Sequence, residues 1–198
     1  MSSKLRERRN LRLTTSLSID NNCSKILPHL YLGGHEMTTD CATLRTLNIS
    51  HILSITIDSY NHYPGEFAYQ QLPILDSVDA NILSILPPSI LFIESAKEAG
   101  GACLVHCSFG MSRSPSIVLG YLMHTEQMSL AQAVRKVKGS RPVTAPNYGF
   151  MQQLANYEIE LRGKVSVDCE KYRENRTAVK KKYFCFFVFC FFVFCFFS

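Results

Sequence analysis

The chain has 198 residues, of which 46% are hydrophobic and 19% are charged, and its formal net charge is +5. This length and apolar content suit one packed domain with short extensions and exclude a largely disordered chain. Both ends are basic and residues 13–161 are net acidic, which argues against a nucleic-acid-binding core. We interpret the basic ends as solvated charge runs, with contact to an anionic membrane or a nuclear address as the alternatives.

Cysteine usage favours a reducing, intracellular setting. Three of the eight cysteines, with nine of the 13 phenylalanines, fall in the last 15 residues or so. The other five are irregularly spaced and form no C-x-x-C pair, so neither a zinc site nor a disulfide framework is expected. No apolar segment follows Met1, so no secretory signal is expected. We expect a cytoplasmic monomer, with the nucleus as an alternative location, that uses no metal or cofactor and binds no nucleic acid.

The organised region is predicted to follow a basic, disordered extension at residues 1–23 and to occupy residues 24–162. Short β-branched runs indicate strands, and longer stretches with apolar residues at helical spacing indicate helices. The first predicted elements are a strand at 30–32, a helix at 40–47, strands at 51–57 and 69–75, a helix at 82–99 and a strand at 102–106. Thr38 or Thr39 is the expected cap of the first helix.

Three more helical patterns follow the last predicted strand. The first runs from Ser114 or Pro115 to about residue 125. The second starts at Ser129, whose capping box includes Gln132, and ends near residue 139. The third follows Asn147. Strands that alternate with helices predict an α/β fold with a central, mostly parallel sheet flanked by helices.

The most informative stretch lies between the 102–106 strand and the helix after it, and reads H-C-x5-R-S from His106 to Ser114. A loop of five residues between a strand and a helix can turn its N–H groups inward, and with the helix N-terminus these groups form an anion cradle. Gly110 permits the backbone path, and Arg113 adds a fork for two phosphate oxygens. Cys107, at the base of the cradle, would be stabilised as a thiolate and would attack phosphorus.

This stretch resembles the signature of the protein tyrosine phosphatase superfamily, in particular its small (atypical) dual-specificity branch. The similarity extends over about residues 24–162 and includes the flanks at 28–34, 72–76, 104–107, 120–123, 141–142 and 146–154. The resemblance implies the cysteine-phosphatase (dual-specificity phosphatase-like) fold. It also implies hydrolysis of phosphotyrosine and phosphoserine or phosphothreonine in proteins through a phosphocysteine intermediate. A phosphoprotein-binding scaffold with weak or no turnover is the alternative.

The resemblance further implies a general acid, an Asp about 30 residues before the nucleophile. Asp76 lies 31 residues before Cys107 and follows a predicted strand end, while Asp79, 28 residues before, is the competitor. Ser114 is implied to stabilise the departing thiolate, and as an alternative it only starts a helix. A mobile loop carries the acid in the family.

The remaining implied site residues bind the phosphate or support the loop. His106 would order the loop, with a satisfied core imidazole as the alternative. Asn147 would cap the last helix and also brace the loop, with capping alone as the alternative. Cys103, on the same strand face as Cys107, is expected in the core. The phosphate-binding residues would be Ser108, Phe109, Gly110, Met111, Ser112 and Arg113. No lysine lies in this loop, which favours a phosphoprotein over a lipid substrate.

The C-terminal part departs from the family pattern. Residues 163–182 are predicted to be a basic, flexible linker, and residues 183–198 form an apolar Phe/Cys tail of low complexity. As a helix, its 15-residue apolar run would span about 23 Å, short of the ~30 Å hydrocarbon core. The alternatives are a membrane anchor, a segment packed on the domain, and translation of a simple nucleotide repeat. Membrane contact is expected only through this tail.

Overall fold

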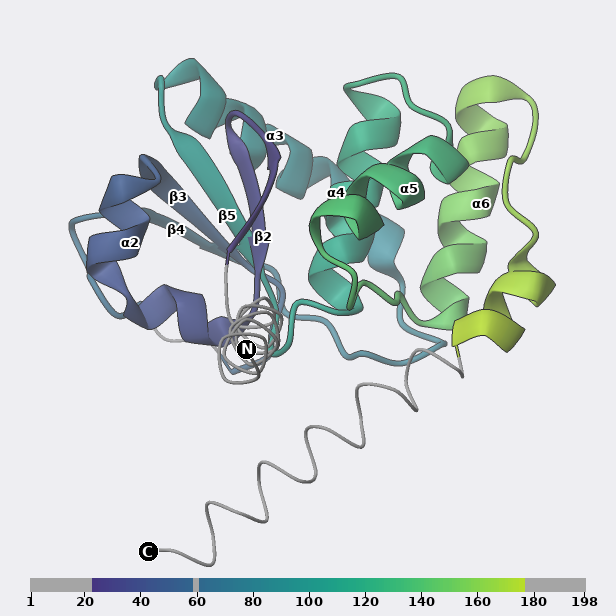
Figure 1. Ribbon diagram of the computed structural model, residues 1–198, viewed down its shortest axis with the longest axis horizontal. Coiled ribbons are helices and arrows are strands. Elements are labelled where there is room, and N and C mark those ends of the chain that lie inside the picture. Colours follow the sequence, from purple (N-terminus) through teal and green to yellow (C-terminus); the bar gives the residue numbers. More distant parts are fainter. Residues whose placement is uncertain (1–22, 59–60, 177–198) are drawn as a thin grey trace, which may run out of the picture.

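The computed structural model describes residues 23–58 and 61–176, which form one sheet with helices on both of its faces (Figure 1). The sheet order is β1-β2-β5-β3-β4. β2, β5, β3 and β4 are parallel, and β1 pairs with β2 in the antiparallel direction. The predicted α/β fold with a mostly parallel sheet is therefore confirmed. The strands are β1 (Ser24–Leu27), β2 (Leu30–Gly33), β3 (Ile49–Ser54), β4 (Ala68–Gln71) and β5 (Ala102–His106).

The helices divide unequally between the two faces. Figure 1 shows α3, α4, α5 and α6 gathered on one side of the sheet, and α2 on the other. Two short 3-10 helices, η1 (His35–Thr39) and η2 (Ile82–Ile85), precede α2 and α3. The α-helices are α2 (Cys41–Thr46), α3 (Leu86–Glu98), α4 (Arg113–His124), α5 (Leu130–Ser140) and α6 (Tyr148–Arg162).

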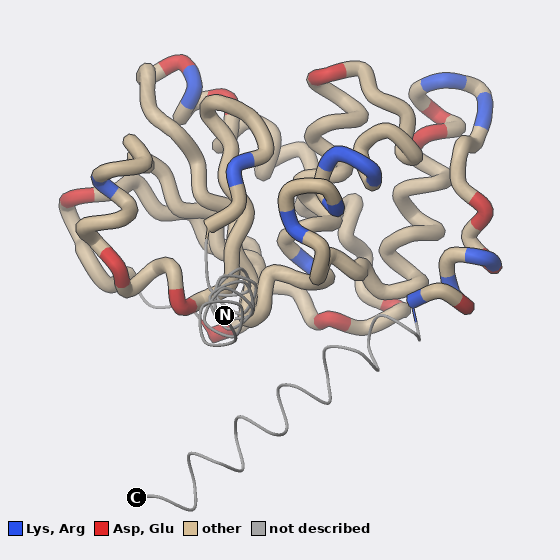
Figure 2. The backbone as a smooth tube through the Cα atoms, viewed as in Figure 1, with Lys and Arg blue, Asp and Glu red and all other residues tan. Residues whose placement is uncertain are grey.

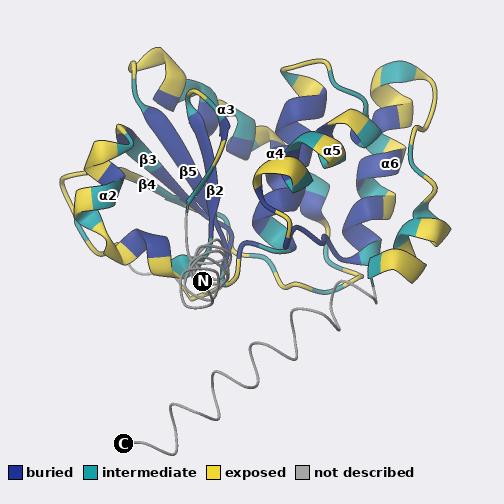
Figure 3. Ribbon diagram, in the orientation of Figure 1, coloured by how far each residue is buried: buried dark blue, intermediate teal, exposed yellow. Residues whose placement is uncertain are grey.

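The central strand β5 is buried on both faces, as its continuous apolar sequence predicts. Because side chains alternate along a strand, Cys103 and Val105 join the core under α3–α6, while Ala102 and Leu104 join the core under α2. Figure 3 shows this buried centre between the exposed outer faces of the helices. The expectation that Cys103 is a core residue is confirmed, and burial raises the pKa of its thiol.

Several predicted boundaries need correction. Asp40, not Thr38 or Thr39, caps α2, because its Oδ1 accepts the N–H of Thr43 at 3.0 Å. The two threonines lie inside η1, where their hydroxyls donate to backbone carbonyls. The strand predicted at 69–75 ends at Gln71, since Pro73 has no N–H to continue the ladder. β1 was not predicted, because four residues with an exposed Lys25 show no strand-like alternation. The capping box of Ser129 and Gln132 is confirmed.

The segment after α6 differs from the predicted flexible linker over its described part. α6 ends at Arg162 and is capped by Gly163, whose φ of +71° is left-handed. Residues 169–176 are helical, and Val167, Cys169 and Tyr172 pack against the main core. In the part of the chain that is described, no helix has the length and apolarity to cross a membrane. The predictions for residues 1–22 and for the apolar tail at 183–198 lie outside the described residues.

Candidate active site

The residues singled out by the H-C-x5-R-S pattern lie at the carboxyl end of the central strand. β5 ends at His106 and α4 begins at Arg113, and residues 107–112 form the loop between them, which we call the phosphate loop. Ligands of open α/β sheets bind outside the carboxyl ends of the strands. Cys107 is only 2% exposed, at the base of the loop. The fold therefore places one buried thiol at the site where this architecture binds ligands.

The carbonyl groups of the phosphate loop are held by the surrounding framework. Five consecutive carbonyls, from Ser108 to Ser112, each accept a hydrogen bond from outside the loop. The donors, in order, are the His35 N–H (3.1 Å), the Arg141 guanidinium (2.9 Å to Phe109 and 2.9 Å to Gly110), the Ala145 N–H (2.7 Å) and the Ser116 N–H (3.1 Å).

This pattern decides where the loop N–H groups point. In a trans peptide the C=O of one residue and the N–H of the next lie on opposite sides, and the described residues contain no cis peptide. The N–H groups of residues 109–113 therefore point away from the framework that holds the carbonyls. A row of N–H groups that faces one way, beside a helix N-terminus, is an anion-binding concavity. The hydrogen bonds to the five carbonyls therefore support the predicted anion cradle.

Gly110 is required by the path of the loop. Its φ is +64°, a conformation that side chains rarely adopt. A Cβ at this position would come within 2.5 Å of the Gly33 carbonyl oxygen and 2.9 Å of Arg141 Nη2. Any larger residue would therefore push the loop off the framework that orients it.

Arg113 spans the phosphate loop from the first turn of α4. Its Nη2 donates to Ser108 Oγ at 2.9 Å, and Nη1 lies 3.4 Å from the carbonyl of Ile74. Its Nε is buried and has no hydrogen-bond partner among the described residues. A buried donor without a partner is costly, so this atom suits a site that is completed by an oxyanion ligand.

Ser114 contacts the predicted nucleophile directly. Its hydroxyl donates to Cys107 Sγ at 3.2 Å, and both residues are buried. It is also the second residue of α4, so both interpretations of Ser114 fit its position.

His106 is held as a neutral imidazole. Burial, with a further contribution from the charge of His35, lowers the pKa of His106 to about 4. The Nδ1 atom is buried, and among the described residues it has no hydrogen-bond partner. The loop-ordering role implied for His106 therefore gains no support from Nδ1 and stays a prediction.

Asp76, and not Asp79, is connected to the phosphate loop. Asp76 Oδ1 accepts from Ser112 Oγ at 2.6 Å and from Asn147 Nδ2 at 2.9 Å. Asp79 is exposed, and its backbone N–H donates to Ser77 Oγ. Both bonds are accepted by Oδ1, so Asp76 is tied both to the phosphate loop and to the start of α6.

Asn147 combines two roles that the sequence analysis named for it. Its Oδ1 accepts the N–H of Phe150 at 2.9 Å, which confirms the predicted cap of α6. Its backbone N–H donates to Ser112 Oγ at 2.9 Å, and its Nδ2 donates to Asp76. One residue at the start of α6 therefore ties the phosphate loop to the predicted acid.

Arg141 is the residue that the sequence analysis missed. Arg141 is 3% exposed, and its guanidinium holds two of the five loop carbonyls. In the sequence it follows the basic residues of α5 directly, so its charge looks like part of an ordinary solvated run. The resemblance to the family at 141–142 was the one available signal, and it carried no role for the residue.

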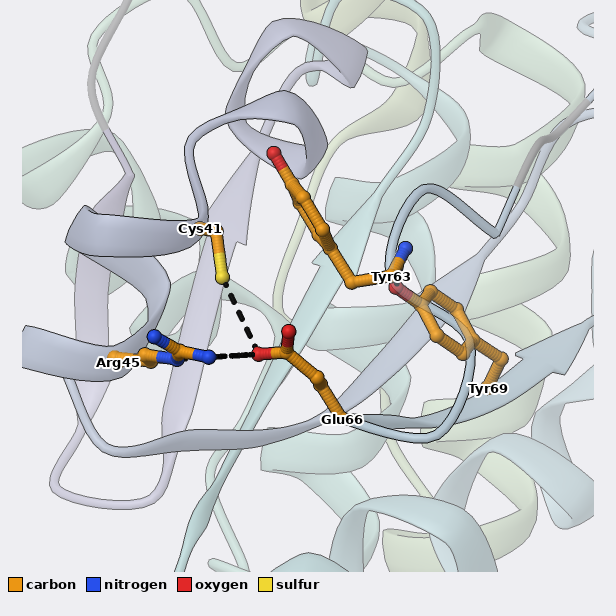
Figure 4. Close-up of polar contacts among 5 residues, drawn as sticks. All are labelled: Cys41, Arg45, Tyr63, Glu66 and Tyr69. Atoms are coloured by element: carbon orange, nitrogen blue, oxygen red, sulfur yellow. Dashed lines mark hydrogen bonds and ion pairs between the residues drawn. The ribbon is translucent and has the colours of Figure 1, made fainter.

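A second polar cluster lies between α2 and the loop before β4, where Figure 4 shows Cys41 and Arg45 converging on Glu66. Cys41 Sγ donates to Glu66 Oε2 at 3.4 Å, and Arg45 Nε donates to the same oxygen at 3.1 Å. Desolvation, followed by the bond to Glu66, raises the pKa of Cys41, which disfavours a nucleophilic thiolate. Nowhere in residues 23–58 and 61–176 do three or more His, Cys, Asp or Glu side chains form a possible metal site.

A buried cysteine and an arginine at the two ends of the phosphate loop, after the central strand of an α/β sheet, are the arrangement typical of cysteine-dependent phosphatases. Residues 30–160 match the family described as "Dual specificity phosphatase, catalytic domain". The chain belongs to this family, as the resemblance in its sequence predicts.

Relatives and solved structures agree with this assignment. The chain is 40% identical over 143 residues to mouse "Dual specificity protein phosphatase 19", a match that covers 72% of this chain and 65% of the relative. A frog (Xenopus laevis) relative, "Dual specificity protein phosphatase 1-A", is 37% identical, and 42% of its length is covered. The chain thus spans less than two thirds of these relatives.

Two solved structures show the same fold at higher coverage. The crystal structure of a single-substitution variant of human DUSP28 is similar with a TM-score of 0.68 and 33% identity, over 71% of this chain and 97% of that one. A mouse putative dual specificity phosphatase, solved in complex with zinc tungstate, has a TM-score of 0.69 and 30% identity, over 72% of this chain and 90% of that one.

Proposed function

We propose that this chain is a protein phosphatase that hydrolyses phosphotyrosine and phosphoserine or phosphothreonine in proteins through a phosphocysteine intermediate. The observation that carries this proposal is the set of five loop carbonyls held by the framework next to Cys107 and Arg113, which supports a row of N–H groups free to bind an oxyanion. Donors fixed before the reaction stabilise the charge that develops on phosphorus oxygens.

In the first step the Cys107 thiolate attacks phosphorus, so that a sulfur–phosphorus bond forms as the ester oxygen–phosphorus bond breaks. The loop N–H groups and Arg113 hold the three non-bridging oxygens. The leaving oxygen takes the proton of Asp76, whose Oδ1 is held by Ser112 and Asn147. The dephosphorylated side chain is released as a neutral alcohol or phenol.

In the second step water attacks the phosphocysteine and gives its proton to the Asp76 carboxylate. The sulfur–phosphorus bond breaks, inorganic phosphate leaves, and the electron pair returns to sulfur. The Ser114 hydroxyl, 3.2 Å from Cys107 Sγ, stabilises the thiolate that departs. Each group then has its starting protonation, so the cycle closes without a cofactor.

The surroundings of the loop support a phosphoprotein substrate. Residues 107–112 contain no lysine, and Figure 2 shows Lys and Arg gathered along α5 and the segment after α6. Phe109, 58% exposed, offers an apolar surface at the rim for the substrate side chain or backbone. All five cysteines of the described part are free thiols, which is consistent with the reducing, cytoplasmic location that we also propose.

The test compares the full chain with Cys107→Ser on para-nitrophenyl phosphate and on phosphotyrosine, phosphothreonine and phosphoserine peptides. We expect turnover by the wild type on all of them and none by the variant. A folded wild type without turnover would overturn the proposal, and retained phosphopeptide binding would then favour the scaffold. Turnover of the phosphotyrosine peptide alone would refute the dual specificity and leave a tyrosine phosphatase.

A further inference from the structure

The segment that orients the phosphate loop, residues 141–147, is itself held from its other side, and we call this segment the brace. The brace supplies Arg141 to two loop carbonyls and the Ala145 N–H to a third, and its Asn147 N–H donates to Ser112 Oγ. Apart from Pro142 its residues are buried. The position of the loop therefore depends on the position of the brace.

A helix outside the matched family region contacts the brace. Residues 169–176 follow the matched region at 30–160 and pack beside α6 (Figure 1). Tyr172 Oη donates to the carbonyl of Pro146 at 2.9 Å, and Arg176 Nε donates to the carbonyl of Ala145 at 3.3 Å. Burial raises the pKa of Tyr172, so its hydroxyl stays protonated and acts as a donor.

Ala145 connects the two sets of contacts. Its N–H donates to the carbonyl of Met111 in the phosphate loop at 2.7 Å, and its own carbonyl accepts from Arg176. One residue therefore separates the helix from the loop. A shift of the helix would release the carbonyls of Ala145 and Pro146 and would free the brace to move with its loop contacts.

The helix is anchored independently of the brace. The buried Glu158 of α6 accepts the N–H and the hydroxyl of Ser166 just before it. Asp168 caps its first turn through the Lys171 N–H at 3.0 Å. The helix also contacts α6, because the Arg173 guanidinium lies 5.3 Å from the centre of the Tyr148 ring. These contacts place Tyr172 against the brace without help from the brace itself.

We infer that the helix at residues 169–176 is a positioning element of the active site, and that Tyr172 and Arg176 hold the brace so that the phosphate loop keeps its N–H groups turned toward an oxyanion. The expected effect of the helix on turnover rests on the proposed function. Its expected effect on oxyanion binding rests on the loop geometry alone. Tyr172 and Arg176 bond carbonyls of the brace, so the helix would act through the brace.

The test is Tyr172→Phe in the full chain, which removes the hydroxyl and keeps the ring. The matched control is Tyr157→Phe, because Tyr157 is another partly buried tyrosine, and its hydroxyl bonds His124 Nδ1 at the far end of α6. The measurements are orthovanadate affinity, kcat and KM on para-nitrophenyl phosphate, and the thermal midpoint. Since one neutral hydrogen bond contributes about 1 kcal/mol, we expect Tyr172→Phe to weaken vanadate binding and kcat about 3- to 10-fold. We expect less than a twofold change in Tyr157→Phe at a similar thermal midpoint.

The outcomes separate the two proposals. If the wild type turns over substrate and the two variants bind vanadate equally well, the positioning role is refuted and the proposed function stands. If the wild type binds vanadate without turnover, the proposed function fails, and the difference between the variants still tests the positioning role. A wild type that neither binds vanadate nor turns over would overturn both proposals.

Discussion

Ser112 Oγ donates a hydrogen bond to Asp76 Oδ1 at 2.6 Å, and the same hydroxyl accepts the N–H of Asn147 at 2.9 Å. A residue of the phosphate loop therefore sets the position of the predicted general acid, 36 residues earlier in the chain. The Ser112 hydroxyl thus connects the loop that would bind the phosphate to the Asp76 carboxyl that would protonate the leaving oxygen. Any movement of the loop would change both.

Asp76→Asn is expected to lower kcat on phosphotyrosine peptides about 10²- to 10³-fold, since a general acid contributes that order of rate. The loss should be smaller on para-nitrophenyl phosphate, because its leaving group needs less help from a general acid. Asp79→Asn is the control and should stay within about twofold of the wild type. The opposite result for the two variants would assign the acid to Asp79.

Ser114→Ala is expected to slow the second step selectively. Without the hydroxyl at 3.2 Å from Cys107 Sγ, the thiolate is a poorer leaving group, so phosphocysteine should accumulate. Rapid-quench kinetics should then show a burst of product followed by a slower steady rate, and the trapped intermediate should carry phosphate on Cys107. A uniform slowing of both steps, with no burst, would favour the interpretation of Ser114 as a helix-start residue alone.

Gly110→Ala is expected to remove most of the oxyanion affinity, because its Cβ would meet the Gly33 carbonyl oxygen at 2.5 Å at a φ of +64°. Forcing a side chain into such a conformation costs about 1–3 kcal/mol, which urea unfolding would detect. Gly139→Ala, in α5 with open space around it, is the matched control. It should leave vanadate binding unchanged and raise stability by about 0.5–1 kcal/mol. Normal vanadate affinity in Gly110→Ala would contradict the geometry argued for the loop.

His106 makes the stability of the fold depend on pH. Burial lowers the pKa of His106 from 6.5 to about 4, so the unfolded chain binds a proton between these values that the native state does not. Stability should therefore fall as the pH drops below about 6.5, by on the order of 2 kcal/mol between pH 7 and pH 5. The free energy of urea unfolding measures this. His106→Gln should flatten the slope, and an equal slope in the variant would show that other groups cause it.

The positions of Cys107, Gly110 and Arg113 in one strand–loop–helix unit were predictable, because the pattern that indicates this unit lies within about ten consecutive residues. Arg141 and Tyr172 were not, since each acts through a hydrogen bond to a backbone carbonyl 26 or more residues away. Every residue type carries a backbone carbonyl, so the sequence does not show which carbonyl will accept a hydrogen bond. Residues 163–176 were predicted to belong to a charged linker because their few apolar residues are scattered among charged ones. In the structure Val167, Cys169 and Tyr172 pack against the core.

The five carbonyls of the phosphate loop are held by residues near positions 35, 116, 141 and 145, which belong to widely separated parts of the chain. The phosphate loop therefore takes its orientation only when η1, α4 and the segment between α5 and α6 have packed together. Phosphatase activity would report complete folding of the domain, and activity and tertiary structure should vanish together along a denaturant titration.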